Sequence, residues 1–485
     1  MLKNKSKLRL AVIISKDKIN LGEIFLIKRL SNITSREIKI YIDNEKKISK
    51  ENKMFKIYKF VDRYLFSKIS QTKNFFSSSN KKSFKYKNIK LLKKDIIQID
   101  RIIDLRKNNL KDDINSKKVW KLYIPSSKEL SQLIFTKNKE VISYIFFRDK
   151  NKKKLLIHNA TQRLNIYSLH ITKILIYMGW MSRIPDLIIK FKSNKIQNYD
   201  ELQIKKLKQL NNYYYFFLII LIRLLFKAAN HFFINDTWNI AFQKNNNKDL
   251  FSIQNDLSKM KFDNSNYFAD PFIVKEKNNL YCFFEKYNIK KKKGIIQVGQ
   301  ITNDLKVKKI KTIINKKYHI SYPYIIKDKN YFWMIPETSR NNSFELYQCS
   351  KFNKKWKLKK KILKKLRTVD SSILYYRNIY WLFTSKVDHC KNSDDFCIYW
   401  SKNLFGEWKP HKMNPIFTNV NYSRNAGSII KHGNSIIRPA QSCLERYGEK
   451  INFFKIERLS KDDYKEKLFK SLDGQPLFKH GMHTW

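Results

Sequence analysis

The chain has 485 residues and a formal charge of +59, with 100 Lys and Arg against 41 Asp and Glu. This length allows two or three domains that each have a core. The lysines are spread along the whole chain, and only 8 Ala, 10 Gly and 9 Pro accompany abundant Ile and Asn. An A/T-biased coding sequence and a solvated lysine surface account for this charge. No specific nucleic-acid site is therefore predicted.

The N-terminal part follows the pattern of an α/β domain. Apolar spacing predicts a strand, a helix and a strand at residues 8–15, 21–30 and 38–42. Further strands of the same sheet are predicted at 96–105, 119–124 and 141–147, with a loop rich in Ser, Lys and Asn at 67–94. No glycine-rich phosphate-binding motif occurs here, which argues against an ordinary nucleotide site. Residues 1–205 are therefore predicted to be one α/β domain.

This order of elements, with Ile103-Asp104-Leu105 and Val119-Trp120-Lys121-Leu122, resembles the N-terminal domain of formyltransferase-like proteins. Active members of that superfamily use an Asn, a His and an Asp around the formyl carbon. Tyr123 stands where the resemblance would place the His. The resemblance therefore implies a degenerate formyltransferase-like scaffold in place of an active formyl transferase.

The most apolar stretch of the chain is 212–233, inside a predicted helical connector at 206–235. Its uninterrupted apolar run, 213–222, ends at Arg223. A helix needs roughly 20 apolar residues to cross a bilayer, so this run is short. Three interpretations remain open: a helix buried between two domains, a helix that lies on a membrane surface, or a membrane span.

From residue 268 onward, one hairpin pattern occurs four times. Each copy has a tight entry, a short apolar strand, a polar turn and a second apolar strand, which is typical of a β-hairpin. The copies lie at 268–285, 321–337, 369–385 and 425–441. Their starts are 53, 48 and 56 residues apart, which is the period of a propeller blade.

The segment around Trp238 is predicted to close the ring together with the C-terminal tail, because closure removes free sheet edges. Four hairpins and this composite unit predict five blades over residues 236–485. The fold class is thus an α/β N-terminal domain followed by an all-β five-bladed β-propeller. The five cysteines are widely spaced without a Cys-x-x-Cys pair, which favours a reducing compartment.

Ordered motifs in this half carry a family resemblance. They are FADPF at 268–272, His319 with SYP at 321–323, IPETS at 335–339, VDS at 369–371, RPAQ at 438–441 with Tyr447-Gly448, and HTW at 483–485. The region resembles the N-terminal domain of glucosamine inositolphosphorylceramide transferases, which is similar to the five-bladed propellers of arabinosidase- and xylosidase-type glycoside hydrolases. The resemblance implies a glycan or sugar-lipid ligand. In the plant-type proteins the glycosyl-transferring step belongs to a separate domain, with no counterpart recognised here, so transferase activity is not implied.

The inner strands of a propeller line its central channel, so equivalent positions of the hairpins are expected to converge there. The strand starts hold Asp270, Tyr322, Asp370 and Asn425, and the ends of the second strands hold Glu285, Glu337, Ser385 and Gln441. Carboxylates that face one opening raise one another's pKa, and glycoside hydrolysis needs such a pair. The hypothesis is that Asp270 acts as general base, Asp370 as its orienting neighbour and Glu337 as general acid.

Further residues of the opening are predicted to bind substrate: Glu285, His319, Tyr322, Arg424, Arg438 and Gln441. Two other interpretations stay open. In the first, the carboxylates bind a glycan without cleaving it. In the second, these residues are structural, with Asp270 capping its own turn and Arg438 in a core ion pair. No cofactor is predicted. The Asp388-His389-Cys390 run has no second ligand group at a fitting distance in sequence, so no metal site is predicted.

The sequence thus predicts a carbohydrate-active or carbohydrate-binding propeller protein that acts on a glycan or sugar-lipid, in cell-surface glycan biosynthesis. Whether it is an enzyme stays open. The alternative is a non-catalytic scaffold that binds a membrane surface or an acidic polymer through its basic surface and apolar helix. The first apolar run is too short for a signal peptide, so a cytoplasmic location is expected, with peripheral membrane contact through 212–233 as a further option.

Overall fold

The computed structural model describes residues 8–485 except 16–20, 44–51, 68–97, 107–116, 194–199, 204–206, 234–237, 245–248, 254–256, 261–264, 329–330, 351, 353–355, 364–365, 388–393 and 474–480. Nearly all of the predicted loop at 67–94, and the Asp388-His389-Cys390 run, lie outside the described residues. The described residues form two compact units, one within 1–233 and the other within 234–485.

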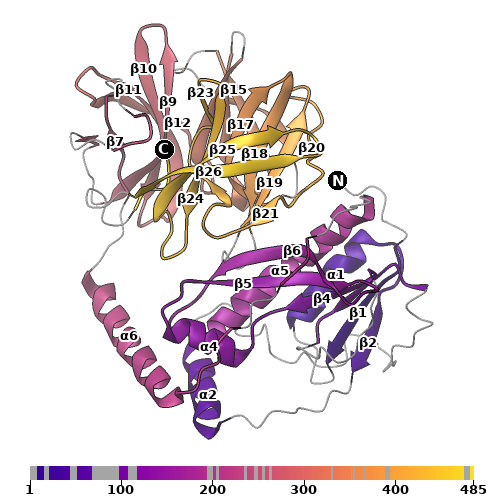
Figure 1. The fold of residues 1–485 in the computed structure, drawn as a ribbon. Coiled ribbons are helices and arrows are strands. Elements are labelled where there is room, and N and C mark those ends of the chain that lie inside the picture. The colour runs from indigo at the N-terminus through magenta and orange to yellow at the C-terminus, as the bar shows by residue number, and fades with distance from the viewer. Residues whose placement is uncertain are drawn as a thin grey trace. The chain divides into compact units, whose positions relative to one another are not determined.

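The first unit is built on a six-stranded sheet with the order β2-β1-β3-β4-β5-β6 (Figure 1). Its strands are β1 (Leu10–Ser15), β2 (Lys39–Asp43), β3 (Arg101–Asp104), β4 (Val119–Tyr123), β5 (Glu140–Arg148) and β6 (Lys154–Arg163). The first four are parallel, and β5 and β6 continue antiparallel from β4. Residues 10–14 are all fully buried, as expected for a parallel strand that is covered on both faces. The predicted α/β region is confirmed.

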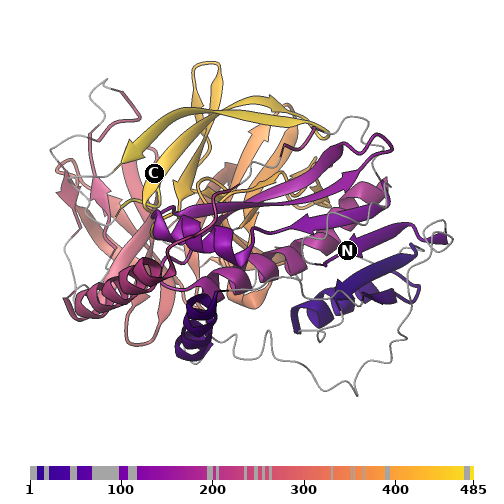
Figure 2. The same ribbon diagram turned by 60° about the horizontal axis from the view of Figure 1, so that its bottom comes forward.

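Helices cover this sheet. Those described in the unit are α1 (Leu21–Ile33), α2 (Lys53–Ser67), α4 (Ser127–Phe135), α5 (Leu169–Ser193) and α6 (Tyr213–Phe233). The long helix α5 runs along one face of the sheet (Figure 2), where Trp180 Nε1 donates a 2.8 Å hydrogen bond to Ser143 Oγ of β5. Ser126 and Glu129 begin α4 with a capping box. The sequence analysis did not predict α2, α4 or β6.

One face of α6 packs against this first unit. The Tyr213 ring lies 4.9 Å from that of Phe55 on α2, and Arg223 Nη1 donates a 2.8 Å hydrogen bond to the carbonyl of Ile134 on α4. Phe216 is fully buried. Within the described residues, no helix has the length and apolar character needed to cross a membrane.

The second unit is a β-propeller, in which the described residues form four blades (Figure 1). Blade 1 consists of β9 (Asn266–Glu276), β10 (Asn279–Asn288), β11 (Lys293–Ile301) and β12 (Val307–Ile314), and blade 2 of β13 (Ser321–Asp328), β14 (Tyr331–Glu337), β15 (Phe344–Cys349) and β16 (Lys357–Ile362). Blade 3 consists of β17 (Thr368–Tyr376), β18 (Ile379–Lys386), β19 (Asp395–Ser401), β20 (Lys409–Pro410) and β21 (Phe417–Thr418), and blade 4 of β22 (Arg424–Asn425), β23 (Ile430–His432), β24 (Ser435–Ser442), β25 (Lys450–Leu459) and β26 (Tyr464–Asp473). All four predicted hairpins are confirmed as the innermost strands of these blades.

Where the sequence predicts a composite fifth blade, the described residues form a two-stranded sheet of β7 (Ala241–Phe242) and β8 (Ser258–Lys259). Ile240 and Phe242 pack against blade 1, whereas Phe251 packs against blade 4. The C-terminal residues lie at the same junction, because Trp485 N–H donates a 2.8 Å hydrogen bond to the carbonyl of Ala426. This segment and the tail therefore fill the gap between the first and last blades.

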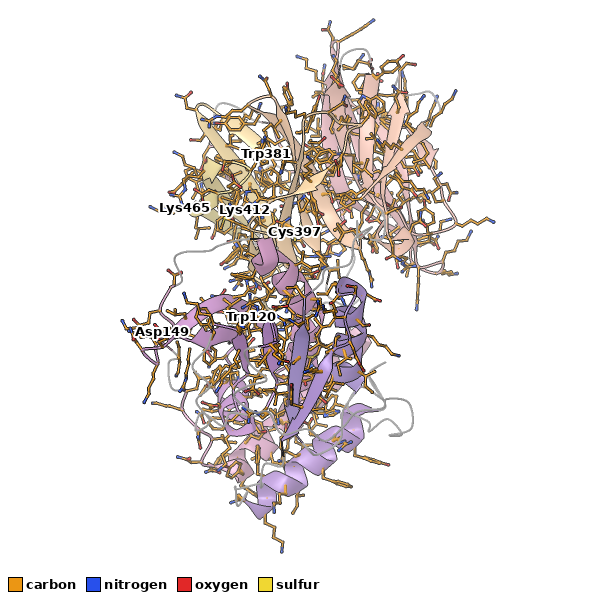
Figure 3. The ribbon with its side chains drawn as sticks, turned by 90° about the vertical axis from the view of Figure 1, so that its right-hand side faces the viewer. Trp120, Asp149, Trp381, Cys397, Lys412 and Lys465 are labelled. Carbon is orange, nitrogen blue, oxygen red and sulfur yellow. The ribbon has the colours of Figure 1, made fainter. Side chains whose placement is uncertain are left out.

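Apolar side chains form separate cores in the two units. Figure 3 labels Trp120 in the first unit and Trp381 in the propeller, and both are 2% exposed. Cys397 of β19 is also buried, whereas Lys412 and Lys465 are exposed on the propeller surface. Every second residue of the propeller strands thus faces the core, and the outward positions carry lysine. This alternation is typical of antiparallel sheets with one face in solvent.

Candidate functional site

The inner strands of the first three blades are interrupted at the same point. In blade 1 the pairing skips from Ala269 to Phe272, which leaves Asp270-Pro271 outside the ladder. Blades 2 and 3 skip Tyr322-Pro323 and Asp370-Ser371 in the same way. The first residue of each bulge has a left-handed backbone, with φ of 53°, 46° and 48°, which costs free energy for any residue except Gly. Bulges of this kind re-aim side chains and are common beside functional sites.

Blade 4 departs from this pattern. Asn425 pairs with Ala440, and this pair corresponds to Ala269 with Glu285 in blade 1. The bulge position of blade 4 is therefore Ala426-Gly427, one residue beyond the position expected from the sequence. Blade 4 thus places no carboxylate at this point of the ring.

Backbone hydrogen bonds tie carboxylates of one blade to the bulge of the next. Tyr322 N–H of blade 2 donates a 3.1 Å hydrogen bond to Asp270 Oδ2 of blade 1. Asp370 N–H of blade 3 donates in the same way to the carboxyl group of Glu337 in blade 2. The left-handed conformation turns these N–H groups toward the neighbouring blade, so the strained backbone holds the acidic side chains in place.

Four carboxyl groups, those of Asp270, Glu285, Glu337 and Asp370, come together at this end of the inner strands. Burial raises the pKa of Glu285 well above its usual range, and the charges of Asp270 and Glu337 raise it further. Burial also raises the pKa of Asp370, where Arg424 opposes the rise and Glu337 adds to it. The pKa of Glu337 is raised by burial as well. The structure thus brings together the three proposed catalytic residues, and the pKa values of Glu337 and Asp370 are both raised.

Arg424 is the cation of this cluster. Its Nε lies 2.7 Å from Asp394 Oδ2 and 3.5 Å from Asp370 Oδ2, although the N–H is not aligned with either oxygen for a hydrogen bond. Gln441 Nε2 donates a 3.0 Å hydrogen bond to Asp370 Oδ2. The guanidinium lies over the Tyr447 ring, 5.1 Å from its centre. Arg424 and Gln441 therefore fix the orientation of Asp370.

The C-terminal tail completes the surroundings of Asp270. Thr484 Oγ1 donates a 3.0 Å hydrogen bond to Asp270 Oδ1, and His483 Nδ1 lies 3.4 Å from the same oxygen. Burial lowers the pKa of His483, with Asp270 opposing. The His483 ring also packs edge-on against Trp238 at 4.2 Å and near Tyr447 at 5.3 Å. Tyr447 is 44% exposed, so an aromatic surface lies beside the carboxylates, as in sites that stack sugar rings.

Glu285 and His319 form a second part of the cluster. His319 Nδ1 accepts a 2.9 Å hydrogen bond from Gly294 N–H and lies 3.6 Å from Glu285 Oε1. A Cβ at Gly294 would lie 2.0 Å from Glu285 Oε1, so only glycine fits there. Glu285 Oε1 is buried without a hydrogen-bond partner. A buried oxygen without a hydrogen-bond partner costs free energy, and its cost is greatest for the ionised carboxylate, in keeping with the raised pKa of Glu285.

Tyr322 and Arg438 point into the core instead. The Tyr322 hydroxyl accepts a 2.7 Å hydrogen bond from Gly427 N–H and donates one of 3.1 Å to the Gly427 carbonyl, which joins blade 2 to blade 4. Arg438 is fully buried and binds Glu466 through Nε and Nη2 at 2.8 and 2.6 Å. Arg438 thus has the core ion pair that the sequence left open as an alternative.

Sequence reasoning did not assign Asp394, His483, Thr484 or Tyr447 to the site. Tyr447 and the final His-Thr-Trp were among the motifs that carried the resemblance, and this was the available signal for them. Asp394 has no such signal, because its contact with Arg424 is produced only by the fold. Among the described residues, no group of three or more His, Cys, Asp or Glu side chains is placed to hold a metal ion.

Replacing Glu285 with Gln is expected to flatten the pH dependence of stability. Because its pKa is raised on folding, the proton on Glu285 stabilises the folded state below the usual carboxyl pKa, and this stability is lost as the pH rises through the raised value. From about pH 5 to about pH 8, the Tm of the wild type should therefore fall more than that of Glu285→Gln, by about 2–4 °C. Thermal unfolding followed by circular dichroism checks this. Glu407→Gln, at an exposed position, should follow the wild type, and equal slopes for all three proteins would contradict the expectation.

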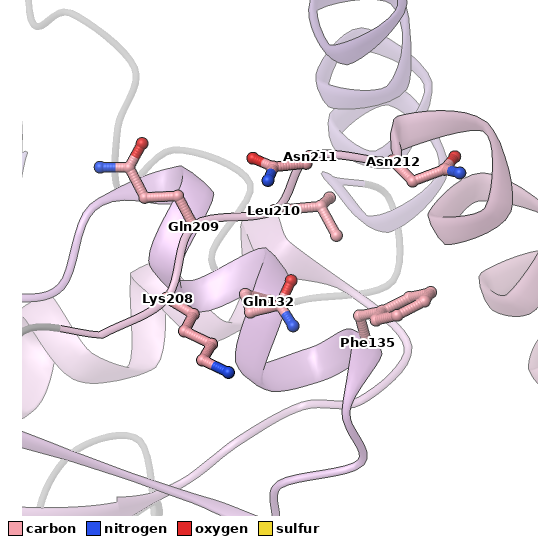
Figure 4. Close-up of a pocket in the computed structure, with 7 residues that line it drawn as sticks. All are labelled: Gln132, Phe135, Lys208, Gln209, Leu210, Asn211 and Asn212. Atoms are coloured by element: carbon pink, nitrogen blue, oxygen red, sulfur yellow. The ribbon is translucent and has the colours of Figure 1, made fainter.

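The first unit contains a pocket of about 490 Å³ lined by Gln132, Phe135 and residues 208–212 (Figure 4). Lys208 is its charged lining residue, and no carboxylate or imidazole lines it.

Elsewhere in this unit, burial raises the pKa of Tyr123 to about 12. A phenol with such a pKa does not exchange protons near neutral pH, so it does not replace the His that formyl transfer would use.

Residues 251–479 match the model of the family described as "Glucosamine inositolphosphorylceramide transferase 1, N-terminal". The predicted resemblance to this family is confirmed for these residues. Glucosamine inositolphosphorylceramide transferase 1 of Arabidopsis thaliana is 35% identical over 209 residues, which are 42% of this chain and 27% of the relative. The protein of the same name from Oryza sativa subsp. japonica is 32% identical over 207 residues, 42% of this chain and 28% of the relative. The chain thus spans less than a third of the length of these curated relatives.

Similar solved structures are glycoside hydrolases. Zg3597, a family 117 glycoside hydrolase of Zobellia galactanivorans, is 12% identical with a TM-score of 0.35, covering 45% of this chain and 74% of that one. The α-L-arabinanase of Cellvibrio cellulosa is 14% identical with a TM-score of 0.32, covering 46% of this chain and 82% of that one. The resemblance of the first unit to formyltransferase-like proteins stays a prediction.

Proposed function

We propose that the propeller binds a glycan or the head group of a sugar-lipid at the Asp270, Glu337 and Asp370 cluster and cleaves a glycosidic bond there. The observation that carries this proposal is the convergence of carboxyl groups with raised pKa values from different blades, beside Arg424 and the exposed Tyr447 ring. Glycosidic cleavage needs one carboxyl group that gives a proton and one that takes a proton. The printed names of the family and of the curated relatives, which act on a sugar and a ceramide lipid, support this ligand class.

The roles follow from the surroundings of each group. Asp270 accepts hydrogen bonds from Tyr322 N–H and Thr484 Oγ1, which suits a base that takes a proton from water as its oxygen attacks the anomeric carbon. Glu337, whose pKa is raised, gives its proton to the leaving oxygen as the glycosidic bond breaks. Asp370, held by Arg424 and Gln441, positions the sugar between them. Water is consumed, and the proton lost by Glu337 is restored from solvent.

The test uses the full chain with 4-nitrophenyl glycosides of glucosamine, arabinose, xylose and galactose. Asp270→Asn and Glu337→Gln are expected to lower kcat/KM by about 10²–10⁴, the usual contribution of a positioned acid or base. The exposed-site variant Glu407→Gln should keep the wild-type rate. Turnover that persists in Asp270→Asn would exclude the assigned base.

Binding without turnover is the second candidate. It is favoured by the deep burial of Glu285 and Asp370, which are 4% and 3% exposed, and by the absence of a carboxylate at the blade 4 bulge. A glycan array separates the two candidates. Glycan binding by the wild type, lost in Asp270→Asn, with no cleavage of the same glycan, would establish a binding module.

The blade count is the finer structural part of the proposal. We infer that β7, β8 and residues 481–485 together act as the fifth blade predicted from the sequence. The packing of Ile240 on blade 1 and of Phe251 on blade 4 supports this, as does the hydrogen bond of Trp485 to Ala426. The tail would then take the place of the inner strand, which explains its contact with Asp270.

A further inference from the structure

Helix α6 presents an apolar surface to solvent. Its first ten residues contain no charged side chain. Within 213–225, the part of the helix whose side chains are described, only Phe216 and Ile220 are buried in the core of the first unit. The large apolar residues that remain 39–67% exposed are Tyr214, Tyr215, Phe217, Leu218, Leu221, Ile222 and Leu225. A helix that is apolar on all sides is normally covered on all sides. Among the residues that the structure describes, the outward side of 213–225 is left uncovered.

Helix α2 extends the same surface. The two helices are in contact, with the Tyr58 ring 4.9 Å from that of Phe216. Helix α2 buries Phe55, Tyr58 and Phe66 toward the core, yet its other side is also apolar. The exposed members there are Met54, Ile57, Phe60, Tyr64 and Leu65, at 46–73%. We call these five residues and the seven on α6 the two-helix apolar face. Exposed apolar residues that gather on adjoining helices, rather than lying scattered singly, mark an interaction surface.

We propose that the two-helix apolar face docks onto the surface of an anionic lipid bilayer. Lys53, Lys56 and Arg63 are exposed on α2 beside this face, and the chain as a whole carries +59, so the charge complements acidic head groups. Apolar residues with tyrosines and flanking basic residues have the composition of helices that lie in the interfacial plane. The inference does not rest on the sugar site of the propeller.

The geometry matches shallow insertion. A helix of 21 residues is about 31 Å long, and an interfacial helix buries one side by about 5–10 Å. In α6 the side that faces α2 and α4 is held by Phe216 and Arg223, so the exposed side is the one available to lipid. The sequence left membrane contact open for 212–233 alone, and the structure adds α2 to the exposed apolar surface.

The test is flotation of the full chain with vesicles of phosphatidylcholine containing about 30% phosphatidylserine. The variant Phe60→Ser/Leu221→Ser/Leu225→Ser removes three side chains of the face that are 73%, 46% and 63% exposed. Its partition coefficient is expected to fall about tenfold or more relative to the wild type, because each lost apolar contact weakens insertion. Wild-type binding should weaken from about 0.1 M to about 0.5 M salt, because screening reduces the attraction of the basic residues.

The matched control is Ile273→Ser/Tyr331→Ser/Leu468→Ser, three propeller residues that are 55%, 45% and 52% exposed. It should float like the wild type. Equal flotation of the two-helix variant and the wild type would overturn the proposal, because the general lysine charge alone would then explain binding. Absence of wild-type flotation would also overturn it. In that case light scattering that shows a wild-type dimer and a monomeric two-helix variant would assign the face to a second copy of the chain.

Discussion

Arg438→Ala is expected to destabilise the propeller by about 3–5 kcal/mol, because it leaves Glu466 as an uncompensated buried charge. Arg438 is fully buried, and its Nε and Nη2 donate to the two carboxylate oxygens of Glu466 at 2.8 and 2.6 Å. The guanidinium also lies 4.3 Å from the centre of the Phe396 ring. The ion pair lies within blade 4, and the contact with Phe396 joins this blade to blade 3. Urea unfolding of the full chain, followed by tryptophan fluorescence, measures the loss.

The chain offers a matched control for this variant. Arg458 Nε lies 2.5 Å from Asp463 Oδ2, but the two side chains are 58% and 47% exposed. An exposed pair contributes about 0–1 kcal/mol, so Arg458→Ala should unfold close to the wild type. Equal losses for the two variants would show that burial does not set the strength of the Arg438 pair.

Gly427→Ala is expected to cost about 2–4 kcal/mol and to displace the C-terminal tail. Gly427 has φ of 117°, and a Cβ there would lie 2.2 Å from the carbonyl oxygen of Trp485. Movement of the tail would take Thr484 away from Asp270, so any glycan binding should weaken together with the free energy of unfolding. Denaturant unfolding and a binding titration with the best glycan of the array measure the two effects.

Gly433→Ala separates backbone strain from steric displacement. Gly433 also has a positive φ, 54°, but no atom lies within 4 Å of its Cβ position. It should therefore lose only about 1 kcal/mol for the left-handed backbone and should bind like the wild type. If Gly433→Ala cost as much as Gly427→Ala, contact with the tail would not be the cause.

The sequence was sufficient to predict the four hairpins. A period-two apolar pattern interrupted by polar turns determines which residues pair, so Glu285 and Glu337 were correctly placed opposite the strand starts. It did not reveal the two-residue bulges, because a left-handed Tyr322 has no local signal. For the same reason Asn425 was aligned one residue before the true equivalent, Ala426.

Contacts between distant segments account for the rest of what sequence reasoning missed. Tyr322 was expected to face a sugar, yet its hydroxyl reaches Gly427, which is 105 residues away along the chain. The partner of Arg424, Asp394, is likewise set by the meeting of two blades. In the first unit, α2 was not predicted, although its apolar residues recur at helical spacing.

The backbone hydrogen bonds between blades link the packing of the ring to the protonation of the acidic cluster. Asp370 N–H binds the carboxyl group of Glu337 across the junction of blades 2 and 3, so protonation of that group and the spacing of the two blades are linked. Linkage is reciprocal. A ligand that removes the proton from Glu337 should strengthen the hydrogen bond between blades 2 and 3. A change that moves these two blades apart should raise the pKa of Glu337.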